Sequence, residues 1–454
     1  MDQVRQAGQI IIIALIFMVV ILVLVGALLG FVFQNVGGTR RAVAGEQALQ
    51  LADAGIDKAV WRLNQTAGAF SGETDTVLGT GVFDVSVATL SGNLKEVTAT
   101  GYVPNKTNPQ ARKQVKVQVS IDTTTISFNY GILVGEGGLQ LQNSARVVGN
   151  VYSNGLIDGT GGTARITGDV YSAGPSGRIF NRVQIDGSAH AHRIDTNVTI
   201  GGSAYGQIMD RVTVGGNVFT NSLSRCTIGG NAFFTTKTAC TIAGSQTTPY
   251  SGEPDPPPET FPPIPSSQIE SWKAQAASGG TITGNYLLSG TQQASLGPKK
   301  IVGDLRLSNT ARLTLTGPLW VTGEIEITNS AVVALAASYG NNSEVMIADG
   351  IIEVKNSAVF QKAGPNSYIM LLTTATGNDD QFEIGNSADG LIAYAPNGEV
   401  EITNSAGLRE IVGWRVEVKN SAQVTYESGL ANVNFSSGPG GSWTVVRGTW
   451  REIK

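Results

Sequence analysis

The sequence predicts a mainly β protein in which one long N-terminal α-helix leads into a parallel β-helix. The chain opens with an uninterrupted apolar stretch. Glycine supplies 57 of the 454 residues, well above its usual share of ~7%, and it alternates with Val, Ile and Thr in a way typical of short strands and tight turns. Two short motifs then recur through most of the remaining chain, which indicates a solenoid.

The first element is a helix long enough to cross a membrane. Residues 10–33 contain no charged side chain, and a helix of that length, at about 1.5 Å per residue, covers a bilayer core of about 30 Å. Downstream, apolar positions recur at steps of three and four residues, which predicts an amphipathic helix. These positions are Ala48, Leu49, Ala52, Ile56, Ala59, Val60 and Leu63. We expect transmembrane and amphipathic helix over residues 9–65.

Both parts of this helical region resemble those of type IV prepilins. A short leader, residues 1–8, carries the basic residue Arg5 and ends in Gly8 directly before the apolar stretch. The later segment QALQLADAGIDKAVWRL resembles the corresponding region of PilX-type minor pilins. The resemblance implies that a prepilin peptidase cuts after Gly8, that Gln9 becomes the new N-terminus, and that the helix packs with those of other pilin subunits.

One residue typical of the family is missing. The position five residues into the mature chain, where pilins usually carry a Glu, is Ile13 here. Major pilins use that carboxylate to pair with the N-terminal amine of a neighbour, so its absence favours a minor or tip subunit. The alternative interpretation is an ordinary signal anchor with its N-terminus in the cytoplasm.

Residues 66–123 are expected to form a small β module like the head of a minimal pilin. Three segments alternate apolar and polar side chains, at residues 81–87, 96–102 and 114–121. Gly92-Asn93 and Pro104-Asn105 supply turn residues between these segments. Three or four antiparallel strands would pack on the upper half of the long helix.

From about residue 126 the chain repeats two motifs. The first reads Gly-polar-apolar-aromatic, and it begins at Gly149, Gly168, Gly187, Gly202, Gly216 and Gly230. In the fourth position of the third copy the aromatic residue is replaced by His190. The second motif reads apolar-x-apolar-x-Asn-Ser-Ala, with Thr310 in place of Ser in one copy. Its copies end at Ala145, Ala311, Ala331, Ala358, Ala388, Ala406 and Ala422.

The second motif selects the kind of solenoid. Alternation directs the two apolar residues inward and the two x residues outward. Asn, which tolerates a left-handed backbone, then marks a corner where stacked amides can hydrogen-bond from coil to coil. We therefore predict a parallel β-helix with coils about 4.8 Å apart, in two blocks at residues 126–248 and 278–437. A β-propeller is the competing fold, but its blades need about 40 residues and a steadier period.

The two cysteines are predicted to form a disulfide. Cys226 and Cys240 lie 14 residues apart, the same interval as Gly216 and Gly230. They therefore occupy equivalent positions on adjacent coils, at a spacing within the ~4.4–6.8 Å that a disulfide accepts between Cα atoms. A reduced pair in the core is the alternative. A zinc site is not expected from two cysteines without a nearby Cys/His pair.

Two further segments interrupt and end the solenoid. Residues 249–277 begin with a proline-rich stretch and continue into a Ser-x-x-Glu capping box at Ser267, which predicts a short helix. The segment is either an interdomain linker or an excursion packed on the solenoid, and the apolar Ile269 and Trp272 favour the excursion. Residues 438–454, which contain two Trp, are expected to cap an open end of the β-helix.

Five glutamates are placed to form a column on the solenoid surface. They occupy the first x position of five successive copies of the second motif: Glu326, Glu353, Glu383, Glu401 and Glu417. Like charges on neighbouring strands are unfavourable, and Lys355 and Lys419 offset them only in part. The column is either a solvated charged face that prevents sheet-to-sheet association, or a cation-binding strip for which calcium is the candidate ion. No other cofactor is expected.

The sequence predicts no enzymatic site. Asp379-Asp380 is the one paired acid of the kind that polysaccharide-degrading β-helices use, with Arg409 and Lys419 as basic candidates. His190 and His192 are assigned to a repeat position that Tyr or Phe takes elsewhere, and His190 is interpreted as a substituted aromatic residue rather than a base. No nucleophile elbow, phosphate loop or histidine-rich metal motif occurs. A formal net charge of −4 gives no sign of a nucleic-acid partner.

Together with the resemblance, these features predict a minor subunit of a type IV pilus or related filament, for which the missing Glu favours the tip over the shaft without deciding between the two. Its β-helical head would serve adhesion or assembly priming. The implied partners are other pilin subunits, the prepilin peptidase, the membrane, and a surface glycan or receptor. The implied location is the cytoplasmic membrane with the head outside, and then the cell surface. Two alternatives stay open: a membrane-anchored β-helix enzyme acting on polysaccharide, and a bactofilin-like structural polymer.

Overall fold

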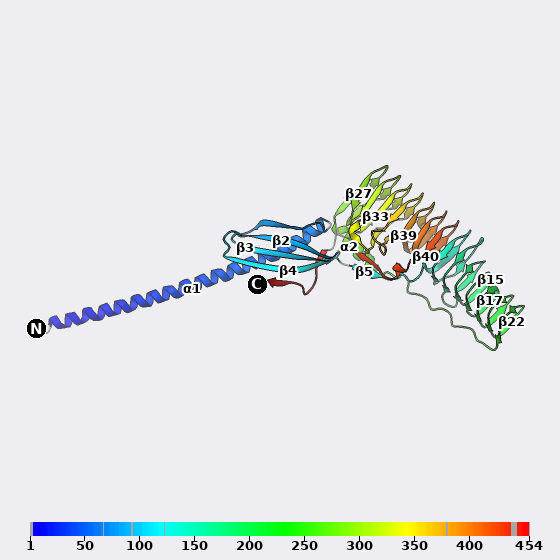
Figure 1. Cartoon of the computed structure of the whole chain (residues 1–454), viewed down its shortest axis with the longest axis horizontal. Helices are drawn as coiled ribbons and strands as arrows, with labels where there is room; N and C mark the ends of the chain where they lie inside the picture. Colours follow the sequence, from blue (N-terminus) through cyan, green and yellow to red (C-terminus); the bar gives the residue numbers. More distant parts are fainter. Residues whose placement is uncertain are drawn as a thin grey trace. The chain divides into compact units, whose positions relative to one another are not determined.

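The chain is mainly β, with one long N-terminal helix, and divides into two units (Figure 1). The computed structural model describes residues 3–66, 68–91, 94–121, 123–377, 380–436 and 443–453. The first unit comprises residues 1–62, 70–120 and 445–454, and the second comprises residues 63–69 and 121–444. The predicted mainly β class is therefore confirmed.

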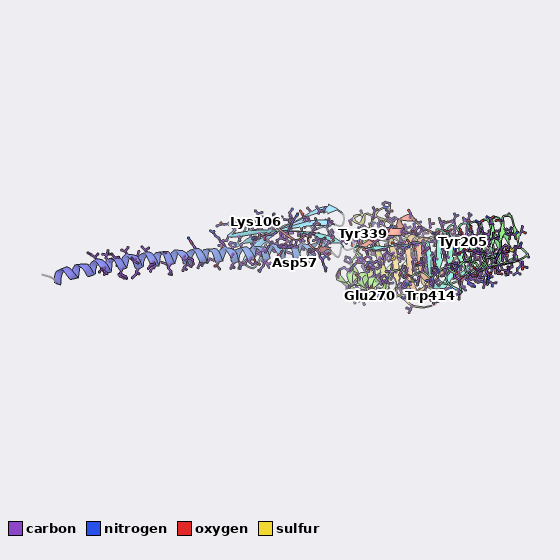
Figure 2. The ribbon with its side chains drawn as sticks, turned by 90° about the horizontal axis from the view of Figure 1, so that it is seen from below. Asp57, Lys106, Tyr205, Glu270, Tyr339 and Trp414 are labelled. Carbon is purple, nitrogen blue, oxygen red and sulfur yellow. A yellow bond between two sulfur atoms is a disulfide. The ribbon has the colours of Figure 1, made fainter. Side chains whose placement is uncertain are left out.

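A single helix, α1 (Gln3–Gln65), covers both of the helical parts expected from the sequence. In its apolar half, Leu15, Phe17 and Leu22 are 62%, 64% and 69% exposed, and the side chains project outward along the helix (Figure 2). By length and composition this helix is able to cross a membrane. Gly8 and Gln9 lie within its backbone.

The second half of α1 packs on an antiparallel sheet. Strands β1 (Gly72–Leu78), β2 (Gly81–Ser91), β3 (Leu94–Val103) and β4 (Ala111–Ile121) pair in chain order. Ala48 and Ala52 of the helix are fully buried, and a Cβ atom on Gly101 of β3 would lie 2.0 Å from the Ala48 carbonyl oxygen. Glycine at this position therefore allows the helix and strand backbones to approach closely. The predicted turn at Gly92-Asn93 lies outside the described residues.

The described part of the C-terminal segment, residues 443–453, does not form the cap of the solenoid that was expected of residues 438–454. Strands β43 (Trp443–Val445) and β44 (Arg451–Ile453) instead extend the sheet of β1–β4 by pairing with β4. The chain enters and leaves the solenoid through adjacent strands, because β5 (Thr123–Ile126) pairs with β42 (Val433–Ser436). The exit therefore lies beside the entry and away from either end of the coil stack.

The solenoid is one sheet of 36 short strands built from both predicted blocks. The first block runs from β6 (Ile132–Leu141) to β24 (Gln246–Thr247), and the second from β25 (Thr281–Thr283) to β41 (Gln423–Thr425). Within each block, the strands of successive coils pair in parallel. Parallel pairs also join the two blocks, β40 (Gly407–Val418) to β6 and β41 to β7 (Arg146–Val148). The last coil of the second block thus stacks on the first coil of the first block, and we call this contact the joint.

Asparagine forms the predicted ladder at one corner of the coils. Five consecutive amide bonds of 2.9 to 3.3 Å connect the Asn side chains, each donated by Nδ2 to the Oδ1 of the next. Each of these residues has a positive φ between 46° and 57°. The ladder runs through Asn143, Asn420, Asn404, Asn386, Asn356 and Asn329. Its Asn143–Asn420 bond crosses the joint, so the ladder continues from one block to the other.

Replacing Asn404 separates the two contributions of the ladder residue. Asn404→Gly removes the amide bonds but accepts the φ of 54°. Asn404→Ala removes the same bonds and also replaces asparagine, whose short polar side chain suits a left-handed backbone, with a residue for which this backbone costs about 1–2 kcal/mol. We expect the stability order wild type, then Gly, then Ala, measured as the midpoint of urea unfolding. An Ala variant as stable as the Gly variant would show that backbone conformation does not select Asn here.

The proline-rich segment and its helix lie on the solenoid, so residues 249–277 form a packed excursion. Helix α2 (Ser266–Ser278) buries Ile269 and Trp272, and it contacts β28 (Lys299–Val302) and β31 (Leu319–Val321). The predicted capping box at Ser267 is wrong, because the N-cap is Pro265 and no side chain bonds to the helix start. Proline suits this place, since it has no N–H to satisfy and its φ is already near −68°.

Candidate functional site: an aromatic column beneath a proline-rich strap

The aromatic residues of the first motif form a stacked column on the outer surface of the solenoid. Consecutive ring centroids lie 4.3 to 5.2 Å apart, and the interplanar angles are 12° or less. The column contains Tyr152, Tyr171, His190, Tyr205, Phe219 and Phe233, one from each coil. His190 stacks between two tyrosines at 4.6 and 4.3 Å, which confirms its interpretation as a substituted aromatic residue.

The same outward row continues into the second block as an apolar surface. Tyr152 is in register with Leu133, which is in register with Val412 and, one coil further, Tyr394. In the second block this row belongs to a buried cluster that includes Trp272 of α2 and Phe435 of β42. In the first block, the segment of residues 249–265, which we call the strap, runs back along the column (Figure 1). The apolar row is therefore covered along both blocks, by α2 and β42 in the second block and by the strap in the first.

The strap is held mainly through its backbone carbonyls. Gly174 N donates to Pro256 O at 2.8 Å, Gln207 Nε2 donates to Glu253 O at 2.6 Å, and Tyr152 Oη donates to Pro257 O. Asn154 makes two bonds to the backbone of Glu259, both at 2.9 Å. A proline-rich chain has no internal hydrogen bonds, so its carbonyls are free to be recognised in this way.

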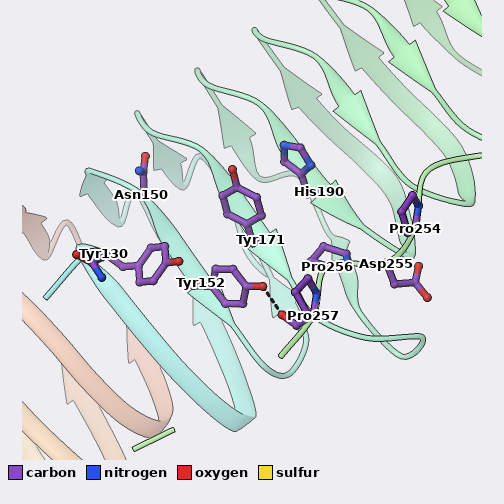
Figure 3. A pocket seen from close by; sticks show the side chains of 10 residues that line it. Tyr130, Asn150, Tyr152, Tyr171, His190, Pro254, Asp255, Pro256 and Pro257 are labelled. Carbon is purple, nitrogen blue, oxygen red and sulfur yellow. Dashed lines mark hydrogen bonds between the residues drawn. The ribbon is translucent and has the colours of Figure 1, made fainter. Parts of the chain in front are cut away.

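A groove of about 720 Å³ lies between the column and the strap (Figure 3). One wall is aromatic and carries Tyr130, Tyr152, Tyr171 and His190, and the opposite wall is residues 254–257 of the strap. Asn129 and Asn150 also line it. Tyr130 continues the column beyond Tyr152, but its ring is tilted by 52°.

Some polar side chains in and beside the groove have hydrogen-bond partners, and others do not. His192 Nδ1 lies 3.0 Å from Asp255, and Tyr130 Oη donates to Glu259 at 2.6 Å. Burial and this bond raise the pKa of Tyr130 well above its usual value. Within the described residues, Tyr171 Oη and the ring nitrogens of His190 have no hydrogen-bond partner. Burial lowers the pKa of His190, so its imidazole is neutral at pH 7.

Sequence reasoning found the aromatic motif but predicted neither the stacked column nor the groove. The aromatic motif and the proline run were both evident, yet nothing in the linear sequence places residues 254–257 against Tyr171 and His190. His192 departs from its expected role as well, because it points to the strap and pairs with Asp255 instead of joining the column. The sequence did contain a signal for the groove. The aromatic position of the first motif points outward on every coil, and such an apolar row predicts that another segment of the chain covers it.

The five glutamates form the predicted column, but lysines lie between them. Each Glu is in register with the next from Glu326 to Glu417. Lys355 Nζ lies 2.6 Å from Glu353 and 2.7 Å from Glu383, and Lys419 Nζ lies 2.9 Å from Glu401 and 3.5 Å from Glu417. Because these ammonium groups already bridge neighbouring carboxylates, the geometry favours a solvated ion-pair face over a calcium strip.

The paired acid suggested for catalysis is only partly described. Asp379 lies outside the described residues, and Asp380 opens strand β38 (Asp380–Ile384). Burial, with Glu401 and Glu383 nearby, raises the pKa of Asp380, while Lys419 lowers it. Arg409 does not join this group but lies 2.9 Å from Glu427. Within the described residues, no group of three or more His, Cys, Asp or Glu side chains is arranged to hold a metal ion.

The cysteines form the predicted disulfide. Cys226 and Cys240 are bonded, with their Cα atoms 4.5 Å apart. Cys240 immediately precedes β23 (Thr241–Ile242), which pairs with β20 (Thr227–Ile228), so the bond joins two successive coils near one end of the stack. A cross-link at this place restrains the coil that has the fewest neighbours.

The buried carboxyl of Glu344 makes the stability of the second unit fall as pH rises. The side chain is fully buried and accepts hydrogen bonds from Tyr339 Oη and, at 2.8 Å, from Val345 N. Burial raises the pKa of Glu344 well above its usual value. At neutral pH the folded state therefore binds more protons than the unfolded state. The contribution of Glu344 to the free energy of unfolding is complete below about pH 4.5 and is lost as pH rises.

Glu344→Gln keeps a polar group of the same shape but removes the titration. We expect the melting temperature of the variant, relative to wild type, to increase from pH 5 to pH 8. Taking the difference between the two proteins cancels the contribution of Glu410, another buried carboxyl with a raised pKa. A difference that stays constant across this range would contradict the assignment.

Comparison with known proteins gives distant likenesses only. No protein-family model matches the sequence, and no curated protein is significantly similar to it. Among solved structures, the competence-associated pilin ComZ from Thermus thermophilus shares 13% identity, with 90% of this chain and 98% of that chain covered and a TM-score of 0.22. An ice binding protein from an Antarctic Flavobacteriaceae bacterium shares 8%, covering 66% and 97%, with a TM-score of 0.14. At these TM-scores neither likeness carries an argument about fold or function.

Proposed function

We propose that this protein is a minor subunit of a type IV pilus or related filament, placed at its tip, and that its solenoid is displayed for adhesion or assembly priming. The observation that carries the proposal is the architecture of the first unit. An apolar helical half with exposed side chains continues directly into a half that packs on an antiparallel sheet. Such a helix can stay in a membrane and later pack among the helices of other subunits while the sheet remains outside.

The prepilin-like leader supports the same proposal. Gly8 precedes the apolar stretch, and Ile13 stands where a shaft subunit would carry its Glu. A tip position also suits a large second unit, which would obstruct the packing of a shaft. The solenoid would serve as a display surface and not as an enzyme: two lysines bridge glutamates of its acidic column, and Arg409, one of the basic residues suggested for catalysis, lies beside Glu427. Its partners would be other pilin subunits, the prepilin peptidase and a surface receptor.

The test is the N-terminus of the protein purified from its host. We expect mass spectrometry to find a chain that starts at Gln9, and to find Met1 retained when the prepilin peptidase is deleted. Gly8→Leu should block processing, whereas Gly26→Leu, the same change within the apolar stretch, should not. An intact Met1 in the wild-type host would identify a plain signal anchor and reject the pilin assignment.

A further inference from the structure

The groove beside the strap has the features of a site for an extended peptide. Its walls are a row of aromatic side chains and a run of prolines, and the one carboxylate among the described residues that line it, Asp255, is already engaged by His192 Nδ1 at 3.0 Å. Three ring-to-ring steps of 5.1, 5.2 and 4.6 Å separate Tyr130 from His190. About five residues of polyproline II, at about 3.1 Å each, cover the same length.

The strap shows how this surface recognises such a chain. Its carbonyls at Glu253, Pro256 and Pro257 each accept a hydrogen bond from the coils. Next to it, Tyr171 Oη and the imidazole of His190 line the groove and have no partner within the described residues. The Tyr171 hydroxyl is the same group as the Tyr152 hydroxyl, which already donates to a strap carbonyl, and the imidazole of His190 carries one N–H that can donate in the same way.

The geometry disfavours a ligand that stacks on the rings. Tyr171 has Tyr152 on one face at 5.2 Å and His190 on the other at 4.6 Å. Because both faces are covered, neither a sugar ring nor a base can stack on this residue, and the stacked rings from Tyr152 to His190 offer only their edges and polar tips. Carbonyl groups of an extended chain suit such tips, and proline rings suit the edges and the proline wall.

We propose that this groove binds a second extended, proline-rich peptide from a partner protein, lying alongside the strap and held by Tyr171 and His190. The strap is then an intramolecular example of the ligand that the surface recognises. The inference concerns the groove alone, so it stands or fails independently of the pilus assignment.

The test uses the full chain in detergent micelles and fluorescein-labelled hexaproline as the probe. We expect fluorescence anisotropy to show saturable binding by the wild type. The double variant Tyr171→Phe, His190→Phe should bind at least tenfold more weakly, because it loses both polar tips. Phenylalanine already occupies the column at Phe219 and Phe233, so stacking and folding are kept, and an unchanged circular dichroism spectrum verifies this.

Tyr205→Phe is the matched control. It makes the same chemical change one coil beyond His190, in a residue that stacks in the column but does not line the groove, so the dissociation constant should equal that of wild type. The proposal is overturned if wild type shows no saturable binding, or if the double variant binds as tightly as wild type. It is also overturned if calorimetry shows that maltotriose binds in the groove and hexaproline does not.

Discussion

Asp in place of Leu139 is expected to break the solenoid at its joint. Leu139 is 2% exposed and lies in register with Val416 across the joint and with Ile157 on the next coil. The substitution removes a buried side chain and places a charge among apolar residues, which together cost more than about 4 kcal/mol. Because coils in a solenoid contact only their neighbours, loss of this contact uncouples the two blocks.

Calorimetry on the full chain measures the effect. We expect the thermal transition of the solenoid to split into two in the Leu139→Asp variant, since the blocks no longer unfold together. Leu287→Asp is the matched control, because Leu287 is 61% exposed and the same change there should alter stability by no more than about 0.5 kcal/mol. A single, unshifted transition in Leu139→Asp would mean that the blocks do not depend on the joint.

Alanine at Gly101 is expected to detach the sheet of the first unit from α1. The new Cβ would lie 2.0 Å from Ala48 O, 2.9 Å from Ala52 N and 2.9 Å from Leu51 Cβ. Two of these contacts are backbone atoms of a helix, which cannot move aside as a flexible side chain would. We expect a destabilisation of about 3 kcal/mol, at the upper end for overpacked sites.

Hydrogen exchange of the β3 and β4 amides reports this loss, because it measures local opening without requiring the whole chain to unfold. The Gly101→Ala variant should exchange these amides faster, while amides of the solenoid keep their wild-type rates. Gly45→Ala is the control, since a Cβ there meets nothing within 4 Å and alanine favours the helix by about 0.5–1 kcal/mol. Wild-type protection in Gly101→Ala would show that helix and sheet can separate without loss of structure.

The local geometry of the coils could be predicted from the sequence because it depends on residues close together in the chain. Alternation directed Leu139 and Leu141 into the core, and Asn404 at its corner has the left-handed backbone and the stacked amide that were expected. The interval between Cys226 and Cys240 equalled one coil, so the disulfide followed from the repeat alone. The helix followed likewise from apolar periodicity.

Only the tertiary structure decided which coil stacks on which, and what covers the outer row. Backbone hydrogen bonds form the ladder between coils, and these bonds are the same for every coil, so the motifs do not specify that β40 pairs with β6. That pairing places the chain's exit beside its entry, where β5 pairs with β42, and the strands within residues 443–453 pair with β4. The strap reaches Tyr152 and His192 for the same reason: it must run back along the first block so that the second can begin at the far end, and there it covers an apolar row that water would otherwise contact.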